Sequence, residues 1–294
     1  MHTRLPNRPS GAALVLAFGL PVLTAASPAA AEAVIARYDV HAAGLTVMKV
    51  EALFDLDSPG GGYAVRTRIR LTGMLGLFSS GDQVTRVEGR WQGLDPQPQR
   101  YRVEGTWRGG RREVAMDYGP GGMPVLLALV PPNDPDREVV PPEMQRGTMD
   151  SLSALAKLTR VVARTGRCDA GAETYDGRRR ASYTVRTEGL DMLPPHDGFG
   201  GGQAVRCAFE SRLVAGRRAD EDPEHARRPQ PATAWLAPVP GTDIPLPVRI
   251  EMPSRWFGTI RVMLTGLEPA PAQPAPPRTV AAASGRQQRL QQTR

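Results

Sequence analysis

Apolar and polar residues alternate along most of the chain beyond residue 33, which is typical of β-strands with one buried face. Two such segments, 46–57 and 63–72, flank the turn sequence Ser-Pro-Gly-Gly-Gly at 58–62. One face of the first segment carries Met48, Val50, Ala52, Phe54 and Leu56, and one face of the second carries Tyr63, Val65, Thr67, Ile69 and Leu71. The pair predicts a β-hairpin.

Strand-like patterns recur further along the chain, at 83–91, 100–107, 112–118, 179–187, 204–214, 232–237, 245–252 and 259–267. Residues 119–147 interrupt the series. This stretch is rich in proline and glycine, has one apolar run at 125–130, and is predicted to be a long crossing connection.

One helix is predicted after this connection, with Asp150 as its N-cap. Its apolar stripe consists of Leu152, Leu155, Ala156, Leu158 and Val162. About ten antiparallel strands and one helix indicate a mainly β fold, namely a single strongly curved antiparallel sheet or open barrel with the amphipathic helix packed on it. Periplasmic lipoprotein carriers and lipocalins have comparable architectures, although a fold alone assigns no function.

Residues 1–31 predict an export signal. Arg4 and Arg8 precede an apolar stretch over 11–24, and small residues follow, with Ala29 and Ala31 fitting a signal-peptidase site. Cleavage after Ala33 is an alternative. An uncleaved membrane anchor is the other interpretation, but the apolar stretch is shorter than the ~20 residues of a spanning helix. The prediction is a periplasmic protein without a transmembrane span after cleavage.

The chain is thus expected to divide into a signal peptide (1–31), a single β-rich domain (32–268) and a tail (269–294). The tail consists mainly of Pro, Ala, Gln and Arg without periodicity, which predicts disorder. It carries four arginines and no acid, which allows a weak contact with an anionic surface.

The net charge of the chain adds little to this functional interpretation. The net charge is +7, and a large share of it lies in the signal and the tail. Lysine occurs only at Lys49 and Lys157, an arginine bias that a GC-rich genome explains. Nucleic-acid binding needs clustered bases with stacking aromatics, and export argues against it, so this class is excluded.

Two cysteines, Cys168 and Cys207, lie in the predicted domain. An even cysteine count in an exported protein predicts a disulfide. Two free buried thiols, or half of a metal site, are the alternatives; the metal alternative lacks a Cys-x-x-Cys motif or a nearby histidine pair.

Motifs for catalysis or for metal binding are not found. There is no His-Glu-x-x-His spacing, and no Gly-x-Ser-x-Gly elbow. Acids at 133–138 lack the glycine and terminal glutamate of a calcium loop. The sequence therefore predicts a protein that is not an enzyme and needs no cofactor.

Aromatic residues on or beside strands are candidates for either core packing or a ligand cavity. The candidate lining consists of Trp91, Tyr101 and Trp107, together with Leu75, Leu77 and Phe78 from the apolar loop 73–81. That loop can serve as a buried cap or as the apolar lip of a cavity mouth.

Several motifs together resemble an uncharacterised family, domain of unknown function 3108, of exported proteins from Gram-negative bacteria. The motifs are Tyr38-x-Val40, Gly147-Thr-x-Asp-x-Leu-Ser-Ala-Leu155, Asp176-Gly-Arg-Arg-Arg180, Ala215-Gly-Arg217 and Trp235-Leu-Ala-Pro-Val-Pro-Gly-Thr242. The resemblance covers 38–267. Where relatives usually have a tyrosine after the Arg-Arg-Arg run, this chain has Ala181. Membership implies periplasmic location, a β-rich domain and the cysteine bridge, but no activity.

Three functions fit these features. The first is a non-catalytic binding or carrier module for an apolar component of the cell envelope. The second is a structural or assembly factor that docks on an envelope protein or a wall partner. A hydrolase of envelope material, acting through scattered carboxylates, is the third.

Overall fold

The computed structural model describes residues 33–271, except 59, 74, 75, 77–79, 134, 200 and 241. Within this part the chain forms one antiparallel sheet of 13 strands in the order β7-β6-β5-β4-β3-β2-β1-β13-β12-β11-β10-β9-β8. Strands that follow one another in sequence are neighbours except β7 and β8, and β1 pairs with β13. The sheet is therefore two meanders joined at the two ends of the domain, with β7 and β8 as free edges.

The first meander comprises β1 (Val34–Ala42), β2 (Leu45–Ser58), β3 (Gly62–Leu71), β4 (Gly81–Gln92), β5 (Asp95–Trp107), β6 (Gly110–Tyr118) and β7 (Pro124–Val130). The second comprises β8 (Ala170–Tyr175), β9 (Arg180–Leu193), β10 (Gly202–Ala215), β11 (Gln230–Val239), β12 (Thr242–Ser254) and β13 (Gly258–Pro269).

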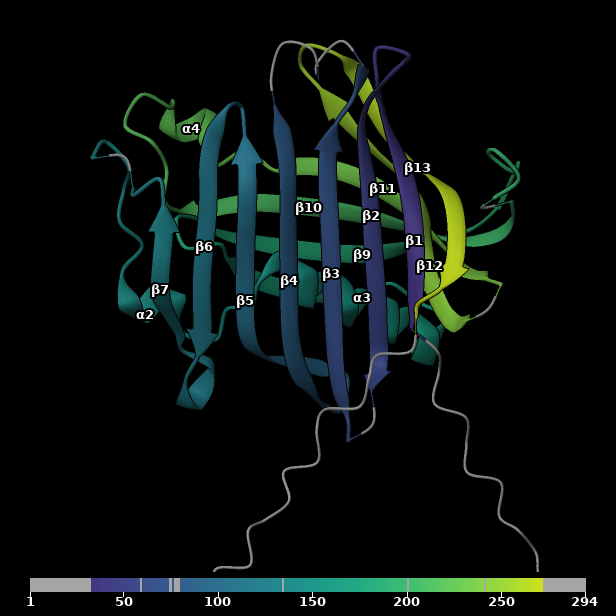
Figure 1. The fold of residues 1–294 in the computed structure, drawn as a ribbon, viewed down its shortest axis with the longest axis horizontal. Helices are drawn as coiled ribbons and strands as arrows, with labels where there is room; N and C mark the ends of the chain where they lie inside the picture. The colour runs from purple at the N-terminus through teal and green to yellow at the C-terminus, as the bar shows by residue number, and fades with distance from the viewer. Residues whose placement is uncertain are drawn as a thin grey trace, which may run out of the picture.

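The sheet curves until the second meander runs behind and across the first, without closing into a barrel (Figure 1). The long helix α3 (Ser151–Thr165) lies between the two halves and contacts β3, β4, β5, β8 and β12. Shorter helices are η1 (Pro120–Gly122), α2 (Pro142–Gln145) and α4 (Pro223–Ala226). The predicted fold class, a curved antiparallel sheet around one amphipathic helix, is confirmed. No helix within the described residues combines the length and apolar character needed to cross a bilayer.

Two strands lie where the sequence pattern predicted none. β7 falls inside the stretch 119–147, where a crossing connection was the prediction, and its sequence PVLLALV does not alternate. Pairing with β6 skips Leu127 as a bulge, and Val125 and Leu127 are exposed, so no face imposes a period of two. β8 is short and rich in small residues, which weakens its signal.

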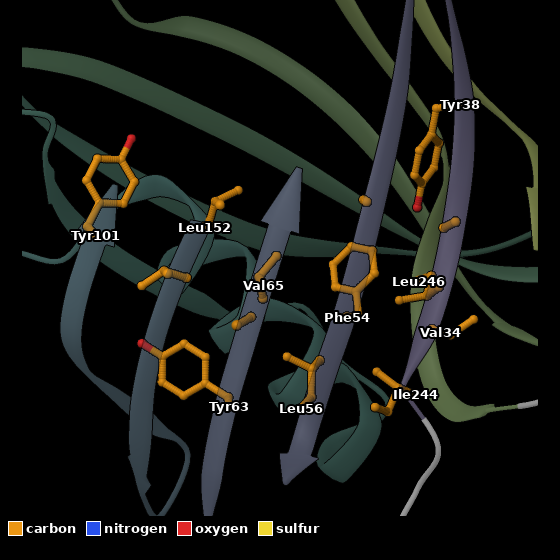
Figure 2. Close-up of a cluster of buried hydrophobic side chains, with 14 of the residues drawn as sticks. Val34, Tyr38, Phe54, Leu56, Tyr63, Val65, Tyr101, Leu152, Ile244 and Leu246 are labelled. Carbon is orange, nitrogen blue, oxygen red and sulfur yellow. The ribbon is translucent and has the colours of Figure 1, made fainter. Parts of the chain in front are cut away.

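The side chains that alternate toward the concave face fill the interior. Figure 2 shows Phe54, Tyr63 and Val65 pointing into this space beside Leu152 of α3 and Leu246 of β12. All five are buried. The hairpin predicted from alternation is formed by β2 and β3, with Phe54 opposite Val65.

The N-terminus of α3 lies inside the protein, so its first N–H groups need acceptors other than water. Asp150 supplies them: its Oδ1 accepts the N–H groups of Leu152 and Ser153, both at 2.9 Å. The Ser153 hydroxyl donates to Oδ2 at 2.6 Å. Because that proton is used, the Tyr63 hydroxyl donates to Ser153 Oγ, at 2.7 Å. Burial raises the pKa of Asp150, and its hydrogen bonds with Ser153 and Leu152 oppose that shift.

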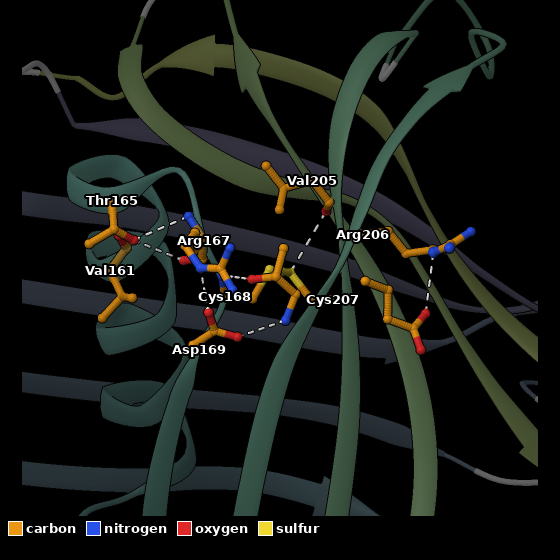
Figure 3. Close-up of a disulfide and its surroundings, with 10 residues drawn as sticks. Val161, Thr165, Arg167, Cys168, Asp169, Val205, Arg206 and Cys207 are labelled. Carbon is orange, nitrogen blue, oxygen red and sulfur yellow. Dashed lines mark hydrogen bonds and ion pairs between the residues drawn. A yellow bond between two sulfur atoms is a disulfide. The ribbon is translucent and has the colours of Figure 1, made fainter.

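The C-terminal end of α3 is fixed by a disulfide. Gly166 caps the helix in the left-handed conformation, and Cys168, two residues further, is bonded to Cys207 of β10 (Figure 3). The Cα atoms are 5.7 Å apart, and both cysteines are fully buried against side chains of α3, β9 and β11. The predicted bridge is confirmed, and it ties the helix to the second meander.

We expect Asp150→Ala to lower the free energy of unfolding by about 2–4 kcal/mol, because buried N–H groups lose their acceptor. Asp150→Asn retains one side-chain oxygen and is the matched control, with a clearly smaller loss. Chemical denaturation followed by circular dichroism measures both. Equal losses for the two variants would contradict the capping role.

Removing the disulfide with the double substitution Cys168→Ala and Cys207→Ala should destabilise the protein by about 3–4 kcal/mol in the chain-entropy model. Thermal unfolding with and without a reducing agent provides the measurement. The Tm of the wild type should fall on reduction, whereas that of the double variant should not respond. If the Tm of the wild type does not change on reduction, the disulfide does not stabilise the fold.

Candidate ligand-binding site

The turn between β8 and β9 joins the two free edges of the sheet, and we call residues 176–179 the latch turn. Asp176 Oδ1 accepts the N–H groups of Arg178 and Arg179, at 2.8 and 2.7 Å, which fixes the turn. Gly177 is buried and has a φ of +91°, and a Cβ atom there would lie 3.2 Å from Leu126 and 3.3 Å from Leu129. The latch turn therefore packs closely on β7.

One hydrogen bond holds the latch turn to the end of β7, and two others hold the segments beside it. The Arg178 guanidinium donates to the carbonyl oxygen of Pro131, just beyond β7. The Arg137 guanidinium donates to the Gly216 carbonyl at 2.6 Å, and Glu138 N–H to the Arg217 carbonyl at 2.8 Å. The connection after β7 is thus bonded to the segment after β10.

Below the latch turn lies a recess of 360 Å³ that we call the mouth cavity. It is framed by β3, β4, β5, β6, β7 and the latch turn, and most of its lining is apolar. The lining residues are Ile69, Gln83, Tyr101, Val103, Trp107, Arg112, Val114, Val130, Asp176 and Arg178. Its volume lies within the roughly 300–1,000 Å³ that small-molecule sites occupy.

Positive charge gathers at the edge of this cavity. Burial lowers the pKa of Arg178, and the neighbouring Arg112, Arg137 and Arg179 lower it further, whereas Asp176 is the acid that opposes them. Burial likewise lowers the pKa of Arg137. Within the described residues the Arg112 side chain forms no ion pair or hydrogen bond. An anion placed here would relieve the repulsion between these guanidinium groups.

Of the residues predicted to line a cavity, Tyr101 and Trp107 line the mouth cavity together. Trp91 lies elsewhere: its ring centroid is 4.8 Å from that of Tyr63, its Nε1 donates to the Leu56 carbonyl at 2.8 Å, and Arg160 stacks on its ring. Leu75, Leu77 and Phe78 lie outside the described residues. The ends of their loop lie beside the cavity, since Ser80 accepts the Gly109 N–H and a Cβ at Gly81 would lie 3.3 Å from Trp107.

Sequence reasoning did not single out Arg112 and Arg178 as binding residues. The Asp-Gly-Arg-Arg-Arg run was noted only as a family motif. Its position over a cavity follows from the contact of Gly177 with β7, which no local pattern encodes.

Two other recesses lie beside β8, β9 and β10. A small apolar groove of 170 Å³ runs between α3 and the strands β8 to β10. It shares Ser151 and Tyr183 with an open polar basin of 650 Å³ that reaches α4. The basin carries Arg179, Arg212 and His225 but also three acids, so its charges largely balance.

Asp150 is the described carboxyl group whose pKa is raised, and both its oxygens are occupied by the helix cap. Across the described residues no three His, Cys, Asp or Glu side chains are grouped to hold a metal ion.

With its curved open sheet and apolar mouth cavity, the chain falls in the class of β-barrel-like domains. Residues 37–265 match the family described as "Protein of unknown function (DUF3108)", and the chain belongs to that family. Its fold is similar to the "Beta-barrel-like Protein of Domain of Unknown Function DUF1849 from Brucella abortus". That crystal structure is 15% identical, with a TM-score of 0.50 over 82% of this chain and 99% of the other. No curated protein matches this chain.

The latch turn can be tested with glycine variants. A Cβ at Gly216 (φ +90°) would collide with the Arg178 carbonyl oxygen, whereas Gly44 (φ +79°) has open space around it. Both substitutions to alanine strain the backbone, but Gly216→Ala should cost about 1–3 kcal/mol more than Gly44→Ala, because it displaces the latch turn. Denaturant unfolding of the two variants measures this difference. If the two variants lose the same free energy of unfolding, the latch turn is not a tightly packed element.

Proposed function

We propose that this protein is a non-catalytic binding or carrier module for an amphiphilic cell-envelope component, with an apolar body and an anionic head. The single observation that carries the proposal is the mouth cavity, in which an apolar lining meets an excess of arginine at one edge.

The lining supports the apolar part of the ligand. Tyr101, Val103 and Val114 are buried on the concave face of the sheet, and Trp107 extends the apolar surface toward the end of β5. Aromatic and branched side chains of this kind hold acyl or ring systems by burial, and burial contributes about 25 cal/mol per Å² of apolar area. A ligand without an apolar portion would leave this wall unused.

The arginines support the anionic head. Arg178 and Arg112 lie on the same cavity, and Arg178 is partly buried, where a guanidinium binds a carboxylate or phosphate strongly. Asp176 does not neutralise them fully, because one carboxylate acts on Arg178 against the three neighbouring guanidinium groups named above.

For the site of action we propose the periplasm. The argument is the export signal over 1–31, with Arg4 and Arg8 before the apolar stretch and Ala29 and Ala31 at the cleavage point. A disulfide agrees with an oxidising compartment. In this proposal the domain 32–268 is the functional unit.

A second candidate function, docking on an envelope protein, is favoured by the edge strand β7. This strand carries no charge, and Val125, Leu126 and Leu127 are 47%, 39% and 57% exposed. Uncharged apolar edges accept a further strand from a partner. In this function the cavity would be incidental.

Binding of the fluorescent fatty acid cis-parinaric acid tests the carrier function. We expect the paired substitution Arg112→Gln and Arg178→Gln to weaken its Kd by about tenfold or more, since each tenfold corresponds to about 1.4 kcal/mol. Binding of the uncharged methyl ester should change little. Arg86→Gln on the exposed outer face of β4, where Arg86 pairs with Glu104, is the matched control.

The result that would contradict the carrier function is a loss of affinity for the acid and the ester alike, or no binding of either. Native mass spectrometry of protein purified from the periplasm provides an independent check. A stoichiometric anionic amphiphile supports the proposal, whereas an apo mass with a co-purified protein would favour the docking function.

A further inference from the structure

The turn between β12 and β13 exposes two aromatic side chains. Trp256 is 86% exposed and Phe257 is 49% exposed. The turn is held by local bonds: Ser254 Oγ accepts the N–H groups of both residues, at 3.4 Å each, and Ser254 pairs with Gly258. The backbone therefore presents the indole ring to solvent, although its burial would be favourable.

A third apolar side chain lies at the neighbouring turn. Leu45, opposite Ala42 in the turn between β1 and β2, is 58% exposed. β1 pairs with β13 as far as His41 and Arg261, so the two turns project from adjacent hairpins at one end of the sheet, the upper end in Figure 1. We call Leu45, Arg255, Trp256 and Phe257 the hairpin rim.

Arginines accompany the hairpin rim. Arg255 is exposed within it, and its Nη1 lies 3.0 Å from His225 Nε2. Arg70 is exposed at the same end of β3, and Arg108 is exposed in the turn between β5 and β6. This end of the sheet therefore combines apolar tips with positive charge.

The carboxylates of the same strand ends are already engaged. Asp82 is paired with Arg68 at 2.6 Å, and Glu113 is paired with Arg111. Near His225, Asp222 caps α4 by accepting the His225 N–H, and Glu224 pairs with Arg228. The arginines of this end thus remain available to an external anion.

The shape of the rim decides between occupants. A stable protein interface buries about 1,200–2,000 Å² over a complementary surface. Three side chains on two turns offer far less. A bilayer interface, by contrast, accepts protruding tryptophan and phenylalanine side chains and adapts to their shape.

We infer that the hairpin rim docks on an anionic lipid bilayer. Trp256, Phe257 and Leu45 enter the headgroup region, and Arg255, Arg70 and Arg108 lie at the level of the lipid phosphates. The inference does not require the proposed ligand. The inference extends the proposed carrier function, because Trp107 of the mouth cavity adjoins the turn between β5 and β6 at this same end of the sheet.

Flotation with vesicles tests the inference on the full exported chain. Vesicles of phosphatidylethanolamine and phosphatidylglycerol at a 3:1 ratio are compared with pure phosphatidylcholine at about 0.1 M salt. We expect binding to the anionic vesicles, weakened roughly tenfold to a hundredfold by the joint substitution Trp256→Ala and Phe257→Ala. Arg255→Gln should reduce the preference for anionic vesicles.

The matched control is the joint substitution Leu190→Ala and Met192→Ala on β9, whose side chains are 60% and 75% exposed and do not belong to the hairpin rim. It should leave vesicle binding unchanged. Parinaric acid binding should be unaffected by the rim variant, so failure of this inference is separable from failure of the carrier function. Equal vesicle binding by the rim variant and the wild type would overturn the docking inference. The absence of wild-type binding to anionic vesicles would overturn it too. If the wild-type protein self-associates and the rim variant does not, the rim binds a second copy of the chain, and the inference of membrane docking is overturned as well.

Discussion

The buried cap of α3 is the interaction on which the arrangement of this domain depends. A helix that begins inside a curved sheet has no water for its first N–H groups, and each unsatisfied group would cost about 1–3 kcal/mol. Asp150 accepts two of these groups, and its second oxygen is bound by Ser153, which in turn is bound by Tyr63 of β3. The cost of burying a carboxylate is thus offset by hydrogen bonds that also fix the helix against the first meander. The disulfide fixes the other end against the second meander.

The position of α3 determines which part of the concave face of the sheet is covered by packed side chains and which part borders a cavity. Beside the helix, Tyr63, Phe54 and Leu152 pack into one buried hydrophobic cluster. Tyr101 marks the boundary, because its ring lines the mouth cavity while Asp150 raises the pKa of its hydroxyl further than burial alone. Beyond it, toward the ends of β3 and β5, the described lining of the cavity contains no residue of α3. The latch turn closes this part only at its edge, which leaves an apolar recess with arginines at its entrance.

Sequence patterns identify those parts of this structure that local rules determine. β2 and β3 were predicted because one face of each is buried, which imposes a period of two, and the helix was predicted from its cap and its stripe. β7 escaped prediction because an edge strand with a bulge and exposed apolar residues has no such period. For the site, the aromatic positions Tyr101 and Trp107 are visible in the sequence. Trp91 has the same local pattern, but Tyr63 and Arg160 enclose it, and only the tertiary structure specifies this. The arginines depend on the packing of Gly177, a long-range contact.

The mouth cavity and the hairpin rim arise from different parts of the chain, yet antiparallel topology brings them to one end of the sheet. Hairpins alternate direction, so the turns after β1, β5 and β12 all project from that end, whereas the cap of α3 lies deeper between the layers. Exposed apolar side chains are costly unless a second phase or a partner covers them. The exposed apolar side chains of the rim lie at the same end of the sheet as the cavity. We therefore interpret the rim and the cavity as parts of one functional end and not as two unrelated surfaces. Because the arginines of the cavity come from β6 and the latch turn, and the aromatic side chains of the rim from the turn between β12 and β13, each feature can be altered without the other.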